Sequence, residues 1–384
     1  MKLINKLKKT IKLLQTELLR IRTKRGTSGD KTKVLVVRLD GIGDFVLWLD
    51  HAMIIRKHYA DAEITLLANS LWADAANAML NYDSVIPLKT SSFINEWAYR
   101  KEILKSLQEN GYDIIVQPRY SRDFLLEDQI TRCCKATLSI AFRSSNQSAT
   151  PFLMKWSDKW YSELFTLPEN VSGEKSINDF FTSNLTGVPL EKVKELLLRT
   201  GEVPDLANTP GKWTQQPYFI IVPGAADPGR RWPPDKFAAA VNQFLQHQQL
   251  RGIICGSEDD KAAAKIIMEN NTGNILDLTG RTTILQLIEL IRKSKFVFSN
   301  DTGAAHIAAY FGIKSVCILG GGQWGRFLPY NDGEDSPHCV YHKLDCYGCE
   351  WKCIYPKKED EPYRCVSTVK VANIVDALMK YTEE

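Results

Sequence analysis

Residues 34–44, Val34-Leu35-Val36-Val37-Arg38-Leu39-Asp40-Gly41-Ile42-Gly43-Asp44, join a short apolar run to a turn that contains two glycines. Such a run of aliphatic, largely β-branched residues is typical of a buried parallel strand. Gly41 and Gly43 permit a tight turn and a close approach of the backbone to a ligand. Because a helical pattern follows from Phe45 to about His58, the stretch predicts the first strand–helix unit of an α/β fold.

The same alternation continues along the chain in two series. Further strands are predicted at 64–67, 85–88, 114–116, 137–141, 218–222, 252–255, 275–278, 296–298 and 315–319, with helices at 96–109, 234–246, 258–270, 283–292 and 302–311. Residues 142–215 are mixed and rich in Ser, Thr, Asn and Pro, so we place the domain boundary there. The pattern predicts two Rossmann-like domains, residues 31–200 and 210–366, with ligands at the carboxyl ends of their strands.

Composition and charge narrow the class of protein. Hydrophobic residues make up 44% and charged residues 24% of the 384 residues, which excludes disorder over most of the chain. Residues 1–33 hold eleven Lys or Arg and two acidic residues, so this arm carries +9 and the remaining 351 residues carry −5. Because the basicity belongs to one arm, we expect no nucleic-acid partner. The start of the chain lacks the pattern of a secretory signal, and we expect a cytoplasmic protein.

Residues 1–30 predict a basic amphipathic helix followed by a linker. An apolar stripe at helical spacing is formed by Ile4, Leu7, Ile11, Leu14, Leu18 and Ile21, with Lys and Arg on the other faces. Three interpretations stay open: a helix that lies on an anionic membrane through residues 1–25, a short coiled coil, and a solvated helix packed on its own domain.

Asp44 follows the first predicted strand, at the start of a helix. It is either an N-capping residue or a functional carboxylate. Val46 stands where a dinucleotide fingerprint would have its third glycine, so that fingerprint is absent.

Three loops of the second domain are predicted to meet at one edge of the sheet. Residues 223–233 carry Arg230 and Arg231 beside small residues, which suits bidentate phosphate binding, or else form a solvated basic loop. In residues 299–306, Asp301 or Thr302 can cap a helix whose amides accept a phosphate, while His306 alone is more typical of a core or surface histidine. A carboxylate such as Glu258 can bind ribose hydroxyls. Together these loops supply what a nucleoside diphosphate needs.

In order, these motifs resemble glycosyltransferase family 9, the bacterial heptosyltransferases that use ADP-heptose. The matching stretches are residues 34–44, 223–225, 231–233, 277–280 and 300–309. The resemblance implies a GT-B fold, with an acceptor domain first and a nucleotide-sugar donor domain second, facing each other across a cleft. It also implies inverting transfer that needs no metal or other cofactor for catalysis.

Residue by residue, the resemblance gives Asp44 the role of catalytic base. It places Gly43, Arg231, Glu258, Asp301, Thr302, Gly303 and His306 at the donor, with Arg231 where the family usually has a lysine. Leu39-Asp40 departs from the small residues that the family often has before the glycine. Arg119 and Arg122 follow a predicted strand and are candidates for an anionic acceptor, or are simply a solvated pair.

We therefore predict transfer of heptose, or a related sugar, from ADP-heptose to a lipid-linked or lipopolysaccharide-core saccharide, at the inner face of the cytoplasmic membrane. The alternatives are a heptosyltransferase acting on an autotransporter protein, a non-catalytic sugar-nucleotide-binding protein and, as a minor possibility, a sugar-nucleotide epimerase.

The cysteine segment, residues 339–365, holds five of the nine cysteines. Cys346, Cys349, Cys353 and Cys365 are spaced closely enough to form a structural zinc or iron site, and free thiols or a disulfide are the alternatives. The last helix, within residues 367–384, is expected to pack back on the first domain, as the resemblance implies.

Overall fold

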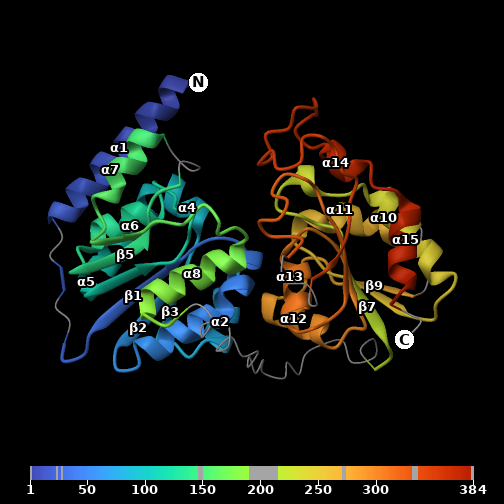
Figure 1. Ribbon diagram of the computed structural model, residues 1–384, viewed down its shortest axis with the longest axis horizontal. Coiled ribbons are helices and arrows are strands. Elements are labelled where there is room, and N and C mark those ends of the chain that lie inside the picture. Colours follow the sequence, from blue (N-terminus) through green and yellow to red (C-terminus); the bar gives the residue numbers. More distant parts are fainter. Residues whose placement is uncertain are drawn as a thin grey trace. The chain divides into compact units, whose positions relative to one another are not determined.

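The chain forms two compact α/β units, each built on a parallel sheet (Figure 1). A computed structural model describes residues 2–22, 25–26, 29–145, 150–189, 215–269, 274–330 and 336–381. One unit holds strands β1 to β6 and the other holds β7 to β12. The predicted α/β class is confirmed, while the boundary predicted between residues 200 and 210 lies outside the described residues.

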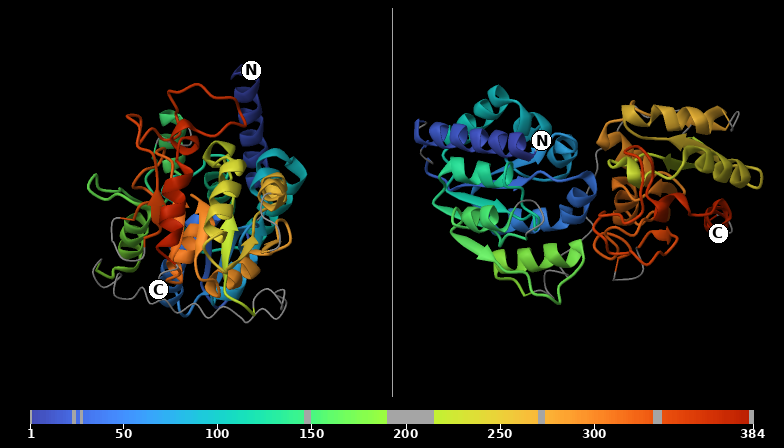
Figure 2. Two further views of the ribbon diagram at one scale, coloured as in Figure 1. Left: turned by 90° about the vertical axis from the view of Figure 1, so that its right-hand side faces the viewer. Right: turned by 90° about the horizontal axis from the view of Figure 1, so that it is seen from above.

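The first sheet runs in the order β3-β2-β1-β4-β5-β6, which is the Rossmann order. Its strands are β1 (Lys33–Arg38), β2 (Glu63–Asn69), β3 (Ser84–Leu88), β4 (Ile114–Gln117), β5 (Leu138–Phe142) and β6 (Glu163–Phe165). Val36 of β1 lies opposite Leu66 of β2 and Val116 of β4. The middle of each of these central strands is buried and mostly apolar because helices cover both faces of the sheet (Figure 2). The turn after β1 therefore emerges at the switch point, where the strand order reverses.

Eight helices precede β7 in the described part of the chain. They are α1 (Lys2–Arg22), α2 (Ile42–His58), α3 (Ala73–Met79), α4 (Thr90–Asn95), α5 (Trp97–Asn110), α6 (Glu127–Cys134), α7 (Pro151–Asp158) and α8 (Glu174–Thr186). The stretch that looked mixed in sequence thus contains α7, β6 and α8. Their mixed composition hid them: α8, for example, interrupts its apolar residues with Ser, Thr and Asn.

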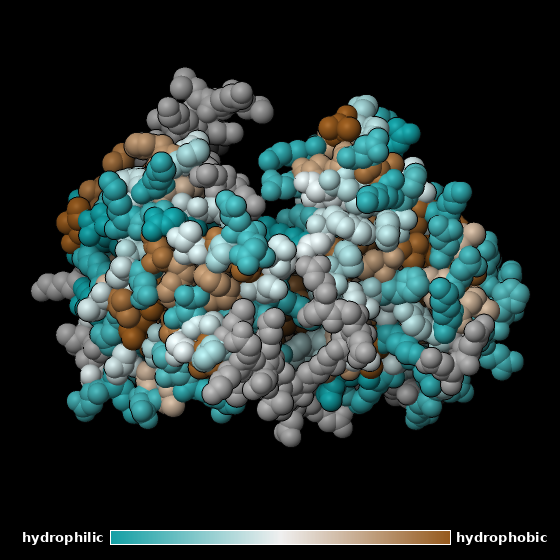
Figure 3. All heavy atoms as spheres, viewed as in Figure 1, coloured by the Kyte–Doolittle hydropathy of each residue, from teal (hydrophilic) through white to brown (hydrophobic). Residues whose placement is uncertain are grey.

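Helix α1 packs on α5 and α6 of its own unit, which is the third of the three interpretations. Thr16 and Leu19 are buried there, and the Arg100 guanidinium of α5 donates to Thr16 Oγ1 at 3.1 Å. The predicted stripe lies on another face and stays exposed at its four described positions, Ile11, Leu14, Leu18 and Ile21. Apolar side chains are visible along the edge of the unit where α1 runs (Figure 3). Helix α1 is thus both docked on its unit and apolar toward solvent.

None of the helices among the described residues is long and apolar enough to cross a bilayer.

The second sheet repeats the Rossmann order as β12-β11-β10-β7-β8-β9. Its strands are β7 (Tyr218–Val222), β8 (Arg251–Ile254), β9 (Ile275–Asp277), β10 (Val297–Asn300), β11 (Ser315–Ile318) and β12 (His338–Val340). The short edge strand β12 was not predicted. The switch point here lies between β7 and β10, so the loops that leave these two strands are neighbours at the carboxyl edge.

The helices after β7 include two that start where their sequence predicts. The described elements are η1 (Pro228–Arg230), α10 (Pro234–Leu245), η2 (Glu258–Asp260), α11 (Lys261–Glu269), α12 (Ile284–Arg292), α13 (Gly303–Tyr310), α14 (Arg364–Ser367) and α15 (Val371–Met379). Pro234 opens α10 at its first position, where its missing N–H costs nothing. Thr283 and Gln286 form a capping box at the start of α12, with bonds of 2.9 and 3.2 Å.

The last helix packs within its own unit. Helix α15 contacts α10, and its Ile374 and Leu378 are fully buried in the core of the second unit. Its expected packing on the first unit stays a prediction.

Candidate active site

The switch point of the second sheet gathers most of the residues that were predicted to bind a donor. We call residues Asp227–Arg231, which follow β7, the arginine loop. Asp227 caps the 3-10 turn, because its Oδ1 accepts from the Gly229 amide at 2.8 Å. Arg231 Nε donates to the Ala225 carbonyl at 2.8 Å, which fixes the direction of the guanidinium.

Both guanidinium groups of this loop retain unused hydrogen-bonding capacity. Arg230 Nη1 is 3.7 Å from Asp301 Oδ2, and Arg231 Nη2 is 3.9 Å from Asp260 Oδ1, distances too long for hydrogen bonds. Arg230 Nε is buried and has no hydrogen-bond partner among the described atoms. The two side chains are 21% and 32% exposed, so an anion can reach them. This arrangement suits phosphate oxygens.

Helix α13 begins beside the arginine loop. Asn300, the last residue of β10, accepts from the Trp232 amide at 3.1 Å and donates to the Pro223 carbonyl at 2.7 Å, which ties the two loops together. Thr302 is the N-cap of α13, and its Oγ1 accepts from the Ala304 amide at 3.4 Å. Gly303 opens the helix at its positive N-terminal end; it is partly exposed and packs so closely against Ile42 that a Cβ would collide.

His306 lies one turn into α13 and is buried. Its Nδ1 is 2.6 Å from the Tyr330 hydroxyl. Burial lowers the pKa of His306 to about 4, so the ring is neutral at neutral pH. His306 is therefore a buried residue with a hydrogen-bond partner, and its role at the donor stays a prediction.

Asp260 is a residue of this edge that sequence reasoning missed. Its Oδ2 accepts from the amide and the hydroxyl of Ser257, both at 2.8 Å. A Cβ on Gly224 would collide with its carboxylate, so the glycine after β7 is needed for this contact. The signal was present as a capping box, Ser257-x-x-Asp260, after a predicted strand. Glu258, the residue that was singled out, is exposed and pairs with Lys261.

At the edge of the first sheet, Asp44 lies in the first turn of α2 and is partly exposed. It is the third helical residue rather than the N-cap, so the capping interpretation does not apply. Beside it in sequence, Asp40 is buried and accepts from Arg38 Nε at 3.0 Å. The buried pair of Arg38 and Asp40, which was not predicted, thus holds the start of this turn in place.

The two arginines proposed for an acceptor differ in exposure. Arg119 is 27% exposed and pairs with Glu127 Oε1 at 2.7 Å. Arg122 is fully buried, pairs with Asp128 at 2.8 Å and with Asp158, and lies over the Tyr161 ring. Burial excludes an acceptor-binding role for Arg122, and equally the alternative of a solvated pair. Only Arg119 remains a candidate.

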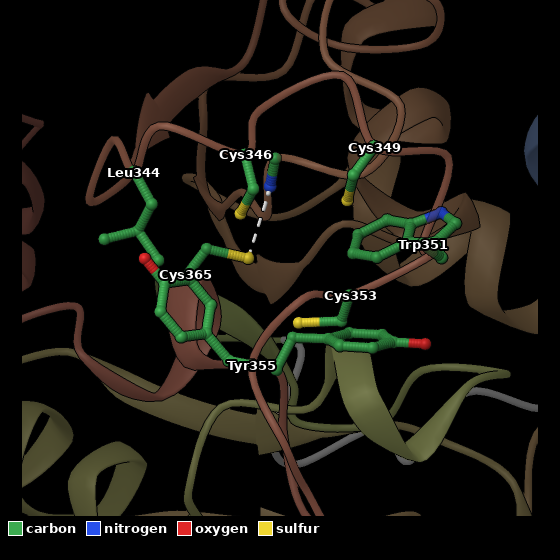
Figure 4. Close-up of a pocket in the computed structure, with 9 residues that line it drawn as sticks. Leu344, Cys346, Cys349, Trp351, Cys353, Tyr355 and Cys365 are labelled. Atoms are coloured by element: carbon green, nitrogen blue, oxygen red, sulfur yellow. Dashed lines mark hydrogen bonds between the residues drawn. The ribbon is translucent and has the colours of Figure 1, made fainter.

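All four cysteines predicted as metal ligands line one pocket. Cys346, Cys349, Cys353 and Cys365 come from different parts of the cysteine segment, and their sulfur atoms point toward a common space (Figure 4). Trp351, Tyr355 and Tyr363 complete the wall. The nine cysteines are all free thiols. As the side chains lie, no three potential ligands of the described residues form a group that could hold a metal ion.

Comparison with known proteins agrees with this architecture. A family model described as glycosyltransferase family 9 (heptosyltransferase) matches residues 100–350. Lipooligosaccharide heptosyltransferase 2 of Campylobacter jejuni is 20% identical over 348 residues, covering 87% of this chain and 93% of the relative.

Two solved structures share the fold. A family 9 glycosyltransferase from Veillonella parvula superposes with a TM-score of 0.65 at 15% identity, covering 94% of this chain and all of that one. Escherichia coli heptosyltransferase WaaC, solved with ADP-2-deoxy-2-fluoro heptose, gives a TM-score of 0.63 at 15% identity, covering 91% of this chain and all of that one. The two Rossmann-like units are those of the GT-B fold. The chain is a glycosyltransferase that belongs to family 9, the heptosyltransferases.

Proposed function

We propose that this protein transfers heptose from ADP-heptose to a lipopolysaccharide-core saccharide, by an inverting reaction that needs no metal. The observation that carries the proposal is the switch point of the second sheet, where two partly exposed arginines and a capped helix N-terminus meet. A diphosphate is the ligand that satisfies both features. The donor found with WaaC and the names of the relatives support heptose as the sugar.

On the donor, Arg231 and Arg230 bind phosphate oxygens, and Gly303 allows the amides of α13 to approach them. Asp301 orients Arg230, and Thr302 caps the N-terminal end of α13. Glu258 accepts from the ribose hydroxyls once it leaves Lys261. As the glycosidic bond to phosphate breaks, its electron pair moves to the leaving ADP, and these cations stabilise the growing charge.

On the acceptor, the Asp44 carboxylate removes the proton from the attacking hydroxyl, whose oxygen forms the new bond to the anomeric carbon. Gly43 is assigned to the donor side, where the His306 ring lies too close for a side chain at this position. Arg119 is held by Glu127 and binds an anionic group of the acceptor.

One set of assays tests this proposal. We expect calorimetry with ADP-, UDP- and GDP-sugars to favour ADP-heptose. Release of ADP should depend on a lipopolysaccharide core acceptor and, at saturating ADP-heptose, persist in EDTA. NMR of the product should show the opposite anomeric configuration to the donor. If an autotransporter protein is turned over and the core is not, the acceptor is the protein and not the saccharide. Absence of ADP release with every acceptor would refute the proposal.

We also propose that the enzyme acts peripherally at the inner face of the cytoplasmic membrane, through α1. Ile11, Leu14, Leu18 and Ile21 are 45–68% exposed, which is unusual for a row of aliphatic residues. The lysines of residues 1–12 would meet anionic lipid while the stripe enters the headgroup layer.

Sedimentation with vesicles tests this surface. The double variant Leu14→Ser/Leu18→Ser should lose binding to anionic vesicles, and Leu71→Ser, an equally exposed leucine outside α1, should not. Equal sedimentation of both variants would exclude the stripe as the contact.

Finally, we propose that the cysteine pocket holds a structural zinc or iron ion. Four thiols around one space are the donor set of such sites, and modest side-chain rotations would be needed to reach the usual distance of about 2.3 Å. Bound there, the ion supplies a cross-link, not catalysis. Elemental analysis should find one ion per chain, lost in Cys346→Ser and retained in Cys339→Ser, a cysteine outside the pocket.

A further inference from the structure

The cysteine segment is clamped onto the glycine run that follows β11. The Gly348 amide donates to the Gly321 carbonyl and the Glu350 amide to the Gly322 carbonyl, both at 2.7 Å. The rings of Tyr347 and Trp351 lie on Gly321 and Gly322 so closely that a Cβ at either glycine would collide with them. The Gly321 amide also donates to Cys365 Sγ at 3.5 Å (Figure 4). The walls of the cysteine pocket are therefore seated on the carboxyl edge of the second sheet.

Tyr363, one wall of that pocket, also holds the arginine loop. Its hydroxyl donates to Asp227 Oδ2 at 3.1 Å, and its amide donates to the Gly229 carbonyl at 2.7 Å. Its ring lies against Gly229, where no side chain would fit. The other oxygen of Asp227 caps the loop, so Tyr363 contacts both the cap and the turn that precede Arg230.

Trp351, another residue of the pocket wall, contacts the arginine loop at one of the loop's guanidinium groups. The Arg230 guanidinium lies 5.7 Å from the centre of the Trp351 ring, within reach of a cation–π interaction. Trp351 in turn stacks on Tyr363, with ring centres 5.0 Å apart and an angle of 27° between the planes. The two stacked rings thus line the cysteine pocket and also contact the arginine loop.

We propose that Trp351 and Tyr363 are positioning residues through which a metal ion in the four-cysteine pocket controls the affinity for the nucleoside diphosphate. This inference rests on the proposed donor site and deepens it. An ion that draws Cys349, Cys353 and Cys365 together orders the chain on both sides of Trp351 and immediately after Tyr363. The arginine loop then needs less ordering when the diphosphate binds, and by linkage the diphosphate strengthens ion binding by the same factor.

The test measures binding, so it does not depend on turnover. The full-length protein is stripped with a chelator, and one half is reloaded with Zn²⁺ alone. We expect calorimetry to show ADP bound about 5- to 100-fold more tightly by the zinc form, the usual range of coupling between two sites. Zinc titrations with and without saturating ADP should give the same factor in reverse.

A pair of variants separates positioning from mere structure. Tyr363→Phe keeps the ring but loses the bond to Asp227, and should reduce the coupling factor while zinc still binds. Tyr355→Phe changes a wall residue whose ring lies under Arg364 rather than the arginine loop, and should retain the full factor.

The outcomes distinguish this inference from the proposed function. Equal ADP affinity of both forms, or failure of the pocket to bind zinc, overturns the inference and leaves the donor site in place. An equal loss of coupling in both tyrosine variants also overturns the role of Tyr363. If neither the zinc-free nor the zinc-loaded form binds ADP, the donor site itself is refuted.

Discussion

Arginines lie near carboxylates at the switch points of both sheets, but the distances between the two charges differ. In the first sheet, Arg38, Arg119 and Arg122 each lie within hydrogen-bond distance of a buried carboxylate. In the second, Arg230 and Arg231 lie 3.7 and 3.9 Å from theirs. The fully buried Arg38 and Arg122 build structure, whereas the looser charges at the second edge keep capacity for an anion. Arg119 is paired but also partly exposed, so it keeps a candidate role at the acceptor. The same residue type therefore indicates different roles, which exposure and the distance to its carboxylate distinguish.

The largest expected effect concerns Asp44, in the turn that follows β1. Asp44→Asn removes the proposed base and should lower kcat by about 10²- to 10⁴-fold, the usual contribution of a general base. ADP affinity should not change, because the donor is bound by the second sheet. Asp50→Asn, later on the same helix, is the matched control. Near-normal turnover of Asp44→Asn would make the first edge purely structural.

Breaking a buried pair at the first edge should destabilise the fold. Arg122→Met removes the buried cation that pairs with Asp128 and Asp158, and removing one partner of a buried pair costs about 3–5 kcal/mol. Arg143→Met removes an exposed arginine 3.9 Å from the same Asp158 and should cost less than about 1 kcal/mol. Urea unfolding measures both. Equal stability of the two variants would contradict the assignment of Arg122 to structure.

At the second edge, the corresponding change should affect binding more than stability. Arg231→Ala is expected to weaken ADP binding about 10- to 100-fold, the value of hydrogen bonds to a charged group. Arg231→Lys should lose less, because it keeps the charge but not the fork. Lys265→Ala, an exposed cation of the same unit, controls for net charge in the calorimetry. If Arg231→Ala binds ADP normally, the arginines of the second edge do not form an anion site.

The smallest effect is a pH dependence from His306. Its pKa is about 4 in the fold against 6.5 in the unfolded chain, so the unfolded state binds more protons between these values. Stability is complete above the unfolded pKa and falls as the pH decreases, by about 1 kcal/mol from pH 7.5 to 5.5. His306→Gln should flatten this slope in urea unfolding, and His342→Gln, an exposed histidine, should not. An unchanged slope in His306→Gln would show that the ring is protonated in the fold.

Local patterns revealed most of the fold, and long-range contacts account for what they missed. Strands such as β1 and β7 were predictable because each is an apolar run that a turn ends at once. Asp260 escaped because its importance depends on Gly224, 36 positions earlier. Arg122 was misjudged because its partner Asp158 follows 36 residues later, and nothing near an arginine in sequence reveals that a helix will bury it. The clustering of the four cysteines was visible because their spacing is local.

Helix α15 sets the order in which the molecule can become complete during synthesis. One hydrophobic cluster of the first unit consists of residues that leave the ribosome early, Leu19 to Cys134. The main cluster of the second unit spans Phe219 to Leu378, and the face of α10 that packs on α15 stays uncovered until α15 has emerged. The core of the unit that carries the arginine loop and the cysteine pocket is thus incomplete until a nine-residue helix has been synthesised. A nascent chain stalled before Val371 should expose that apolar surface to chaperones.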